Sequence, residues 1–176
     1  MSDADLGKKL AEEAYLLPFL DEYKAVTGVD LQLDRSGERP DFICLRRGKP
    51  TGIELVRVVQ NPTLRLHRED QMDGLEAATR VQDVVYAKEA KRLSAGWSYP
   101  DRTILVVQLM DATLLDMALF LNEDRMKEVS TTGFLEVWVA DYTLLEAFRT
   151  VQLFGVKPRR WRGVHPHRFR DRKPYG

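Results

Sequence analysis

Residues 40–56 read PDFICLRRGKPTGIELV, which is two apolar runs joined by a short polar stretch. The joining residues include Gly48, Pro50 and Gly52, and such residues favour a tight turn. Each apolar run has the length and composition of a β-strand, so the stretch predicts a β-hairpin. A third strand-like run, VDLQLD at residues 29–34, precedes the hairpin across the turn-forming residues RSGERP. The three runs together predict an antiparallel three-stranded meander.

Helical patterns lie on both sides of this predicted meander. Apolar residues recur at helical spacing from Leu6 to Leu20, which predicts a first helix over residues 3–26 that ends before Gly28. The elements predicted after the meander are a helix that ends near Ala95, a buried strand at 102–111, a helix at 112–124, a strand at 133–141, a helix at 142–150 and a last edge strand at 151–156. Strands that alternate with helices favour right-handed parallel crossovers. The order therefore predicts an α/β fold with a mixed sheet flanked by helices.

The composition is that of one globular domain. The chain has 176 residues, of which 44% are hydrophobic and 31% are charged, and this length suffices to bury a core without disulfide or metal staples. We expect a single domain over residues 1–156 and a basic C-terminal tail over residues 157–176. No apolar run approaches the roughly 20 residues that span a bilayer, and the N-terminus lacks an apolar signal segment. We therefore expect a cytoplasmic protein with no membrane partner.

Cys44 is the only cysteine and lies inside the apolar run DFICL. A single cysteine excludes an internal disulfide and a cysteine-rich zinc site. Reactive thiols need an accessible, electropositive setting, so this one is predicted to be a buried structural thiol.

The order αβββαβ resembles the core of the restriction-endonuclease-like, or PD-(D/E)XK, nuclease superfamily. In that family the second strand begins with Asp, and the third strand carries an acidic residue followed two positions later by Lys. The matching residues here are Asp41, which follows Pro40, and Glu54. The short turn between their strands predicts that the two carboxylates lie close together. Carboxylate oxygens suit a hard divalent cation, so we expect Asp41 and Glu54 to bind Mg²⁺ or Mn²⁺, and the Leu55 carbonyl is a further candidate ligand.

The Lys of the family pattern is missing, because its position is occupied by Val56. Arg57 should point to the opposite face of the strand, and Gln60 shares the face of Glu54 but lies two pleats further on. Lys88 is a stronger candidate, since it interrupts the apolar stripe of the following helix. Some restriction-like nucleases carry the catalytic Lys on a neighbouring element, so Lys88, or else Lys91, could take that role. The alternative is a Lys88 side chain that covers apolar surface and reaches solvent.

Other carboxylates extend the candidate site. Some members of the superfamily add a carboxylate from the first helix, which makes Glu13 a candidate metal ligand here. The alternative is that Glu12 and Glu13 are solvated helix charges. Asp111 follows a predicted buried strand, and we expect it to cap the next helix.

The predicted tail at residues 157–176 carries eight Lys and Arg against one Asp, so its net charge is +7 on a body of −7. Arginine pairs with phosphates, and aromatic rings between arginines can stack on bases. The residues predicted to bind nucleic acid, with DNA as the first expectation, are Arg159, Arg160, Trp161, Arg162, Arg168 and Arg170. The alternative partner is the acidic body of the same chain or of a second copy, which would make a homodimer.

Two functions follow from the predicted fold and site residues. The first is a metal-dependent nuclease that hydrolyses DNA or RNA with Asp41, Glu54 and Lys88. The second is a catalytically inactive protein of the same fold that binds nucleic acid or a protein partner. Polar groups that converge on the two carboxylates would favour the first function, and an apolar lining around Val56 with no Lys within reach would favour the second.

Overall fold

The computed structural model describes residues 3–58, 72–94 and 96–165. In chain order the elements are α1 (Asp3–Thr27), β1 (Leu31–Ser36), β2 (Phe42–Arg46), β3 (Lys49–Val58), α2 (Gly74–Arg92), the 3-10 helix η1 (Pro100–Arg102), β4 (Thr103–Leu109), α3 (Leu114–Ala118), α4 (Glu123–Ser130), β5 (Glu136–Asp141), α5 (Leu145–Phe148), β6 (Gln152–Lys157), the 3-10 helix η2 (Arg159–Trp161) and β7 (Gly163–His165). The predicted succession of helix, three strands, helix and strand is therefore observed up to β4.

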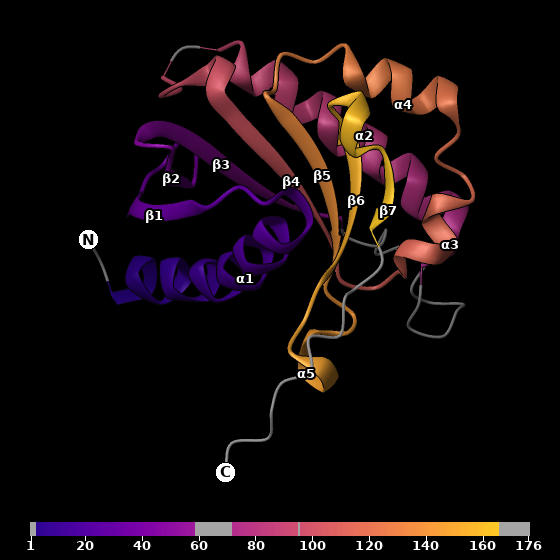
Figure 1. The fold of residues 1–176 in the computed structure, drawn as a ribbon, viewed down its shortest axis with the longest axis horizontal. Coiled ribbons are helices and arrows are strands. Elements are labelled where there is room, and N and C mark those ends of the chain that lie inside the picture. Colours follow the sequence, from indigo (N-terminus) through magenta and orange to yellow (C-terminus); the bar gives the residue numbers. More distant parts are fainter. Residues whose placement is uncertain (1–2, 59–71, 95, 166–176) are drawn as a thin grey trace.

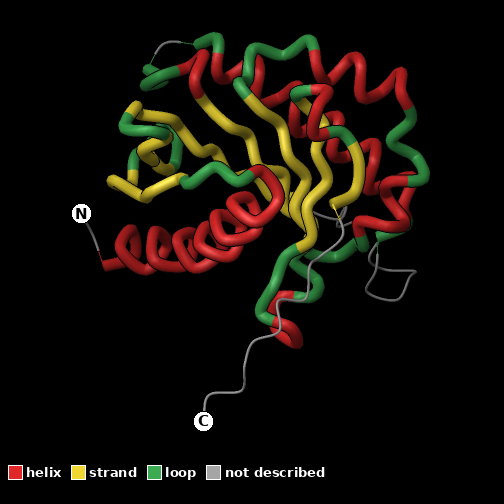
Figure 2. Tube along the Cα trace, in the orientation of Figure 1, coloured by secondary structure: helices red, strands yellow, loops and turns green. Residues whose placement is uncertain are grey.

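One seven-stranded sheet organises these elements (Figure 2), and its strands lie side by side in chain order from β1 to β7, as labelled in Figure 1. The first three strands form the predicted antiparallel meander. Strands β3, β4 and β5 are mutually parallel, and β6 and β7 return to antiparallel pairing. The predicted α/β class with a mixed sheet is confirmed.

A two-residue turn sets the register of the β2–β3 hairpin. Arg46 pairs with Lys49, which leaves Arg47 and Gly48 as the turn. Both turn residues have positive φ angles, 51° and 73°, which is the backbone of a type I′ turn and favours glycine. The same register pairs Phe42 with Ile53, so the residues on either side of that pair also face each other across the two strands.

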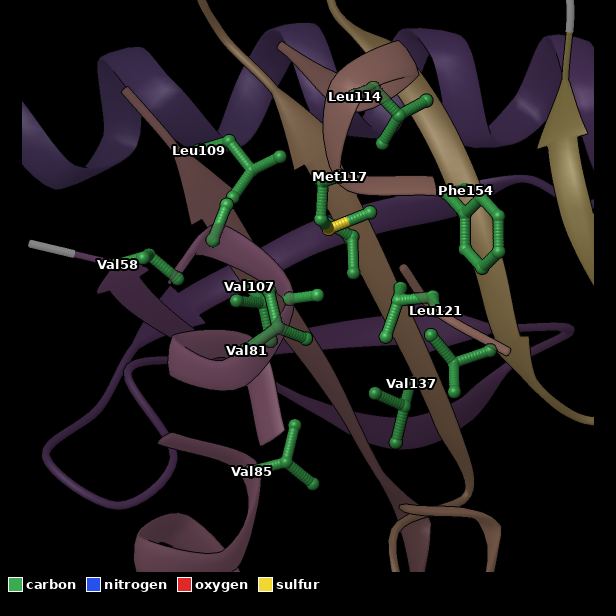
Figure 3. Packing of buried hydrophobic residues seen from close by; sticks show 14 of the residues in the cluster. Val58, Val81, Val85, Val107, Leu109, Leu114, Met117, Leu121, Val137 and Phe154 are labelled. Carbon is green, nitrogen blue, oxygen red and sulfur yellow. The ribbon is translucent and has the colours of Figure 1, made fainter. Parts of the chain in front are cut away.

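Helices cover both faces of the sheet (Figure 1). Helix α1 lies on one face, and α2, α3 and α4 lie on the other. On the α2 face, Val81 and Val85 belong to one buried cluster with Val107 of β4 and Val137 of β5 (Figure 3). On the α1 face, the buried cluster includes Phe19. Each such side chain contributes about 1.5–3 kcal/mol relative to exposure, so both faces hold the sheet in place.

The predicted helix over residues 112–124 is divided into α3 and α4. Asn122 interrupts it, because its side-chain oxygen accepts a hydrogen bond from the Arg125 amide at 3.0 Å and begins a new helix. The prediction that Asp111 caps the first of these helices is wrong. The Thr113 side chain is the cap, and it accepts from the Asp116 amide at 3.2 Å.

The predicted helix over residues 142–150 contracts to the four residues of α5. The Asp141 carboxylate accepts hydrogen bonds from both the amide and the hydroxyl of Thr143, and the helix begins only after this turn. Arg149 ends the helix with a left-handed backbone, φ 54°.

The predicted tail begins inside the sheet. Strand β6 extends through Lys157, and β7 pairs with β6 through Leu153 and His165. β6 is therefore not the last edge strand, because β7 covers its outer side. The chain stays within the fold as far as His165, and residues 166–176 lie outside the described residues.

Cys44 is buried, as predicted. Burial raises the pKa of its thiol to about 12, which keeps the sulfur protonated at neutral pH. Among the described residues, no helix is long and apolar enough to cross a membrane.

Candidate functional site

Asp41 and Glu54 face each other across β2 and β3, as the register of the hairpin requires. The Asp41 amide donates a hydrogen bond to Glu54 Oε2 at 3.2 Å. In return, the Leu55 amide donates to Asp41 Oδ2 at 2.8 Å. The predicted proximity of the two carboxylates is confirmed, because each is held against the backbone next to the other.

The position of Asp41 just before β2 explains why its side chain turns toward β3. Strand β2 begins at Phe42, so no residue of β2 pairs with Leu55. The Asp41 carboxylate therefore accepts the hydrogen bond of the Leu55 amide in place of a backbone carbonyl. Gly52 makes the close approach feasible. A Cβ at that position would lie 2.5 Å from Pro40 Cγ and 2.6 Å from Thr103 Oγ1, so a larger residue would push Pro40, and with it Asp41, away from β3.

Lys88 reaches the carboxylates from α2. Its Nζ atom forms an ion pair with Glu54 Oε1. The Lys88 side chain is 19% exposed and that of Glu54 is 5% exposed, so the pair is largely screened from water. The prediction that Lys88 points toward the two acids is confirmed, and the solvent-reaching alternative is wrong. Lys91, the other lysine considered, is exposed.

Val56 packs with the apolar cluster under α2 and offers no polar atom to the site. Arg57 points to the opposite face, as predicted, where its guanidinium carbon lies 4.5 Å from the centre of the Tyr15 ring. Gln60 lies outside the described residues. The cation next to Glu54 therefore comes from α2 and not from β3.

The site carries two carboxylates and one lysine, and this excess of negative charge acts on Asp41. Burial and the charge of Glu54 raise the pKa of Asp41 to about 6. The hydrogen bond from the Leu55 amide and the charge of Lys88 work in the opposite direction without cancelling the rise. A further positive charge at the pair would lower the pKa of Asp41.

The first helix contributes a charge through Glu12. The carboxylate of Glu12 is among the causes that raise the pKa of Asp41. Glu13, which was the predicted ligand, makes no hydrogen bond or ion pair with Asp41, Glu54 or Lys88 in the described part of the chain. Helical spacing alone could not decide between two adjacent glutamates.

A metal ion at this site would depend mainly on two carboxylates. No group of three or more His, Cys, Asp and Glu side chains suited to a metal ion occurs among residues 3–58, 72–94 and 96–165. The Leu55 carbonyl lies on the same strand edge as the Leu55 amide, since both groups of a residue face the same neighbouring strand. Within the described residues, Asp41, Glu54 and this carbonyl are the candidate oxygen ligands.

The predicted nucleic-acid residues divide into three groups. Trp161 is partly buried, with its ring 6.3 Å from that of Trp138. Arg162 donates to the Val156 carbonyl and to Ser130 Oγ, so both Trp161 and Arg162 hold the end of the sheet together. Arg159 and Arg160 are exposed. The remaining two, Arg168 and Arg170, lie outside the described residues.

The structure thus brings together Asp41 from the residue before β2, Glu54 from β3 and Lys88 from α2. Their roles as metal ligands and catalytic group stay predictions, as do those of the tail arginines. Comparison with family models, with curated proteins and with solved structures found no match to the chain.

Proposed function

We propose that this chain is a metal-dependent nuclease with a restriction-endonuclease-like core. Asp41 and Glu54 would hold Mg²⁺ or Mn²⁺, and Lys88 would supply the cation that the family places on the third strand. The observation that carries the proposal is the ion pair of Lys88 with Glu54 beside Asp41. Polar groups converge on the carboxylates, which is the arrangement expected of the active form and not of the inactive one.

The carboxylate pair suits a hard divalent cation. Magnesium is commonly bound through one or two carboxylates and keeps several waters, so a third acidic ligand is not required. The pKa of Asp41 is raised first by its partial burial and then by the charge of Glu54. A cation bound at the pair would offset the repulsion between the Asp41 and Glu54 carboxylates, and this favours binding of the cation.

Each group of the site would have a distinct task. The bound ion would activate water and stabilise the negative charge that develops on the phosphate. Lys88 fixes the orientation of the Glu54 carboxylate and places a positive charge where phosphate oxygens would approach. The Leu55 amide fixes the Asp41 carboxylate in the same way. Both acids are therefore preorganised before any ion binds.

The test is a cleavage assay with Mg²⁺ or Mn²⁺ on single-stranded, double-stranded and branched DNA and on RNA. We expect cleavage that is lost with EDTA and falls about 100-fold or more in Asp41→Asn, Glu54→Gln and Lys88→Met. Lys91→Met and Asp83→Asn are the matched controls, since both residues are exposed on α2. Equal activity in the control and site variants would contradict the assignment of the site.

The inactive alternative makes a different prediction in the same experiment. Nucleic acid would then bind without being cleaved, and the Asp41→Asn variant would bind as tightly as the wild type. Size-exclusion chromatography of the same protein tests the homodimer, and localisation of a tagged protein tests the cytoplasm as its compartment. We propose DNA as the first substrate to assay.

A further inference from the structure

A second site lies on the other face of the sheet, in a cavity of about 820 Å³. Met110 and Asp111, which follow β4, line it together with Tyr142 and Thr143, which follow β5. The cavity therefore opens at the carboxyl ends of two adjacent parallel strands. The volume falls in the range of small-molecule sites.

Two tyrosines make an aromatic corner in this cavity. The rings of Tyr15 on α1 and Tyr142 meet edge to face, with centres 5.6 Å apart and an interplanar angle of 75°. The Tyr142 hydroxyl donates to the Tyr15 carbonyl at 2.7 Å, which fixes the two rings relative to each other. A rigid aromatic wall of this kind suits a planar ring.

A buried amide lies behind the same corner. The side chain of Gln108 is 2% exposed and lies close to the Tyr142 hydroxyl, whose pKa burial raises despite this contact. Within the described residues its Nε2 atom makes no hydrogen bond of normal geometry. Gln108 is not among the residues that line the cavity, so it contributes there only by supporting the Tyr142 ring.

Two arginines lie at or beside the cavity, and no described carboxylate forms an ion pair with either. Arg57 is exposed and stacks on the ring of Tyr15, which lines the cavity, and Arg149 is itself a lining residue. Arg46 and Arg92, in contrast, form ion pairs with carboxylates. Among the described residues, neither Arg57 nor Arg149 does so. Their guanidinium groups are therefore available to an anionic group on a ligand.

We propose that this cavity binds a nucleotide. The base would lie against the tyrosine corner, and the phosphate would contact Arg57 and Arg149. Asp111 and Glu146, which also line the cavity, would accept hydrogen bonds from amino groups on the base. The choice of a nucleotide over other planar anions rests on the proposed nuclease function.

The nucleotide site is separate from the carboxylate pair. Arg57 lies three residues after Glu54 on β3, which is roughly 10 Å along a strand. Three residues also reverse the direction of a side chain, so Glu54 faces α2 and Arg57 faces α1. Binding at the cavity should therefore not depend on Asp41.

The test is calorimetric titration of the full chain in EDTA with AMP, CMP, adenosine and inorganic phosphate. We expect both nucleotides to bind more tightly than adenosine or phosphate, because only they engage both parts of the site. Arg57→Gln and Arg149→Gln should each weaken nucleotide binding roughly tenfold. Lys127→Gln is the control, since Lys127 is exposed on α4 across the sheet. Both arginines are exposed, and melting curves verify that the variants are folded.

The outcomes separate this inference from the proposed nuclease activity. Nucleotide binding that responds to the arginine variants, but not to Asp41→Asn, supports the site even if no substrate is cleaved. Tighter binding of a tetradeoxyadenylate than of AMP identifies a nucleic-acid strand as the source, and equal binding identifies the free nucleotide. The inference is overturned if AMP does not bind, if adenosine binds equally well, or if both arginine variants bind like the wild type.

Discussion

Replacing Asp41 with Asn should stabilise the folded protein at neutral pH. The pKa of the Asp41 carboxyl is raised from 3.8 to about 6 in the fold, first by burial and then by the charge of Glu54. The folded state therefore holds this proton more tightly than the unfolded state does. The ionised carboxylate costs stability above pH 6, and the cost disappears as the pH falls below about 4.

The size of the effect follows from the shift in pKa. Each unit corresponds to about 1.4 kcal/mol, so the full shift sets an upper limit of about 3 kcal/mol. Asp41 is only partly buried in the fold, and solvent screening reduces the value, so we expect a gain of roughly 1–3 kcal/mol for Asp41→Asn at pH 8. Asparagine keeps an oxygen for the Leu55 amide, so the hydrogen bond that holds β3 is retained.

Urea unfolding of the wild type and of Asp41→Asn at pH 4 and pH 8 measures this difference. The variant should be more stable at pH 8, and the two proteins should converge at pH 4. Asp83→Asn, at an exposed position on α2, should give the same difference from the wild type at both pH values. An Asp41→Asn protein that is less stable than the wild type at pH 8 would refute the reasoning. Mg²⁺ should stabilise the wild type more than the variant, since it binds the ionised pair.

Three further perturbations test the same structure. Lys88→Met should cost roughly 1–3 kcal/mol in urea unfolding at pH 8, because it leaves Glu54 buried beside Asp41 without a cation; adding Glu54→Gln should restore most of the loss. Gly52→Ala should cost roughly 1–3 kcal/mol through the clash with Pro40 and should also lower any cleavage activity, whereas an unchanged melting temperature would contradict the close approach. Deletion of residues 166–176 should weaken DNA binding and flatten its salt dependence by about 0.9 per lost phosphate contact, with the melting temperature nearly unchanged; a large loss of stability would instead indicate that this segment packs on the acidic body.

The local part of the site could be predicted from the sequence because it depends on near neighbours. The Gly48 turn sets the register of β2 and β3, and this register alone brings Asp41 opposite Glu54. Lys88 could be predicted to face the sheet because it interrupts the apolar stripe of its helix. Val81 and Val85 of that stripe are indeed buried against the sheet. Turn chemistry and periodicity act over a few residues, so they are readable without a structure.

Local patterns failed where competing side chains decided the outcome. An apolar periodicity over residues 112–124 predicted one helix, yet Asn122 caps a second helix inside it. The basic composition of residues 157–165 predicted a tail, yet Trp161 and Arg162 are used to close the end of the sheet. In each case a hydrogen bond or a packed ring outweighed the average character of the segment.

By itself, the sequence determined the α/β class, the hairpin with its two acids, and the lysine that faces them, because short-range turn and periodicity rules govern all three. Only the tertiary structure selected Glu12 over Glu13 as the helix charge that acts on Asp41. Only the tertiary structure brought Tyr15 to Tyr142, 127 residues away along the chain, and formed the cavity that both residues line. Such contacts depend on the order of the strands and on the face that α1 covers, and neither is encoded in any single segment.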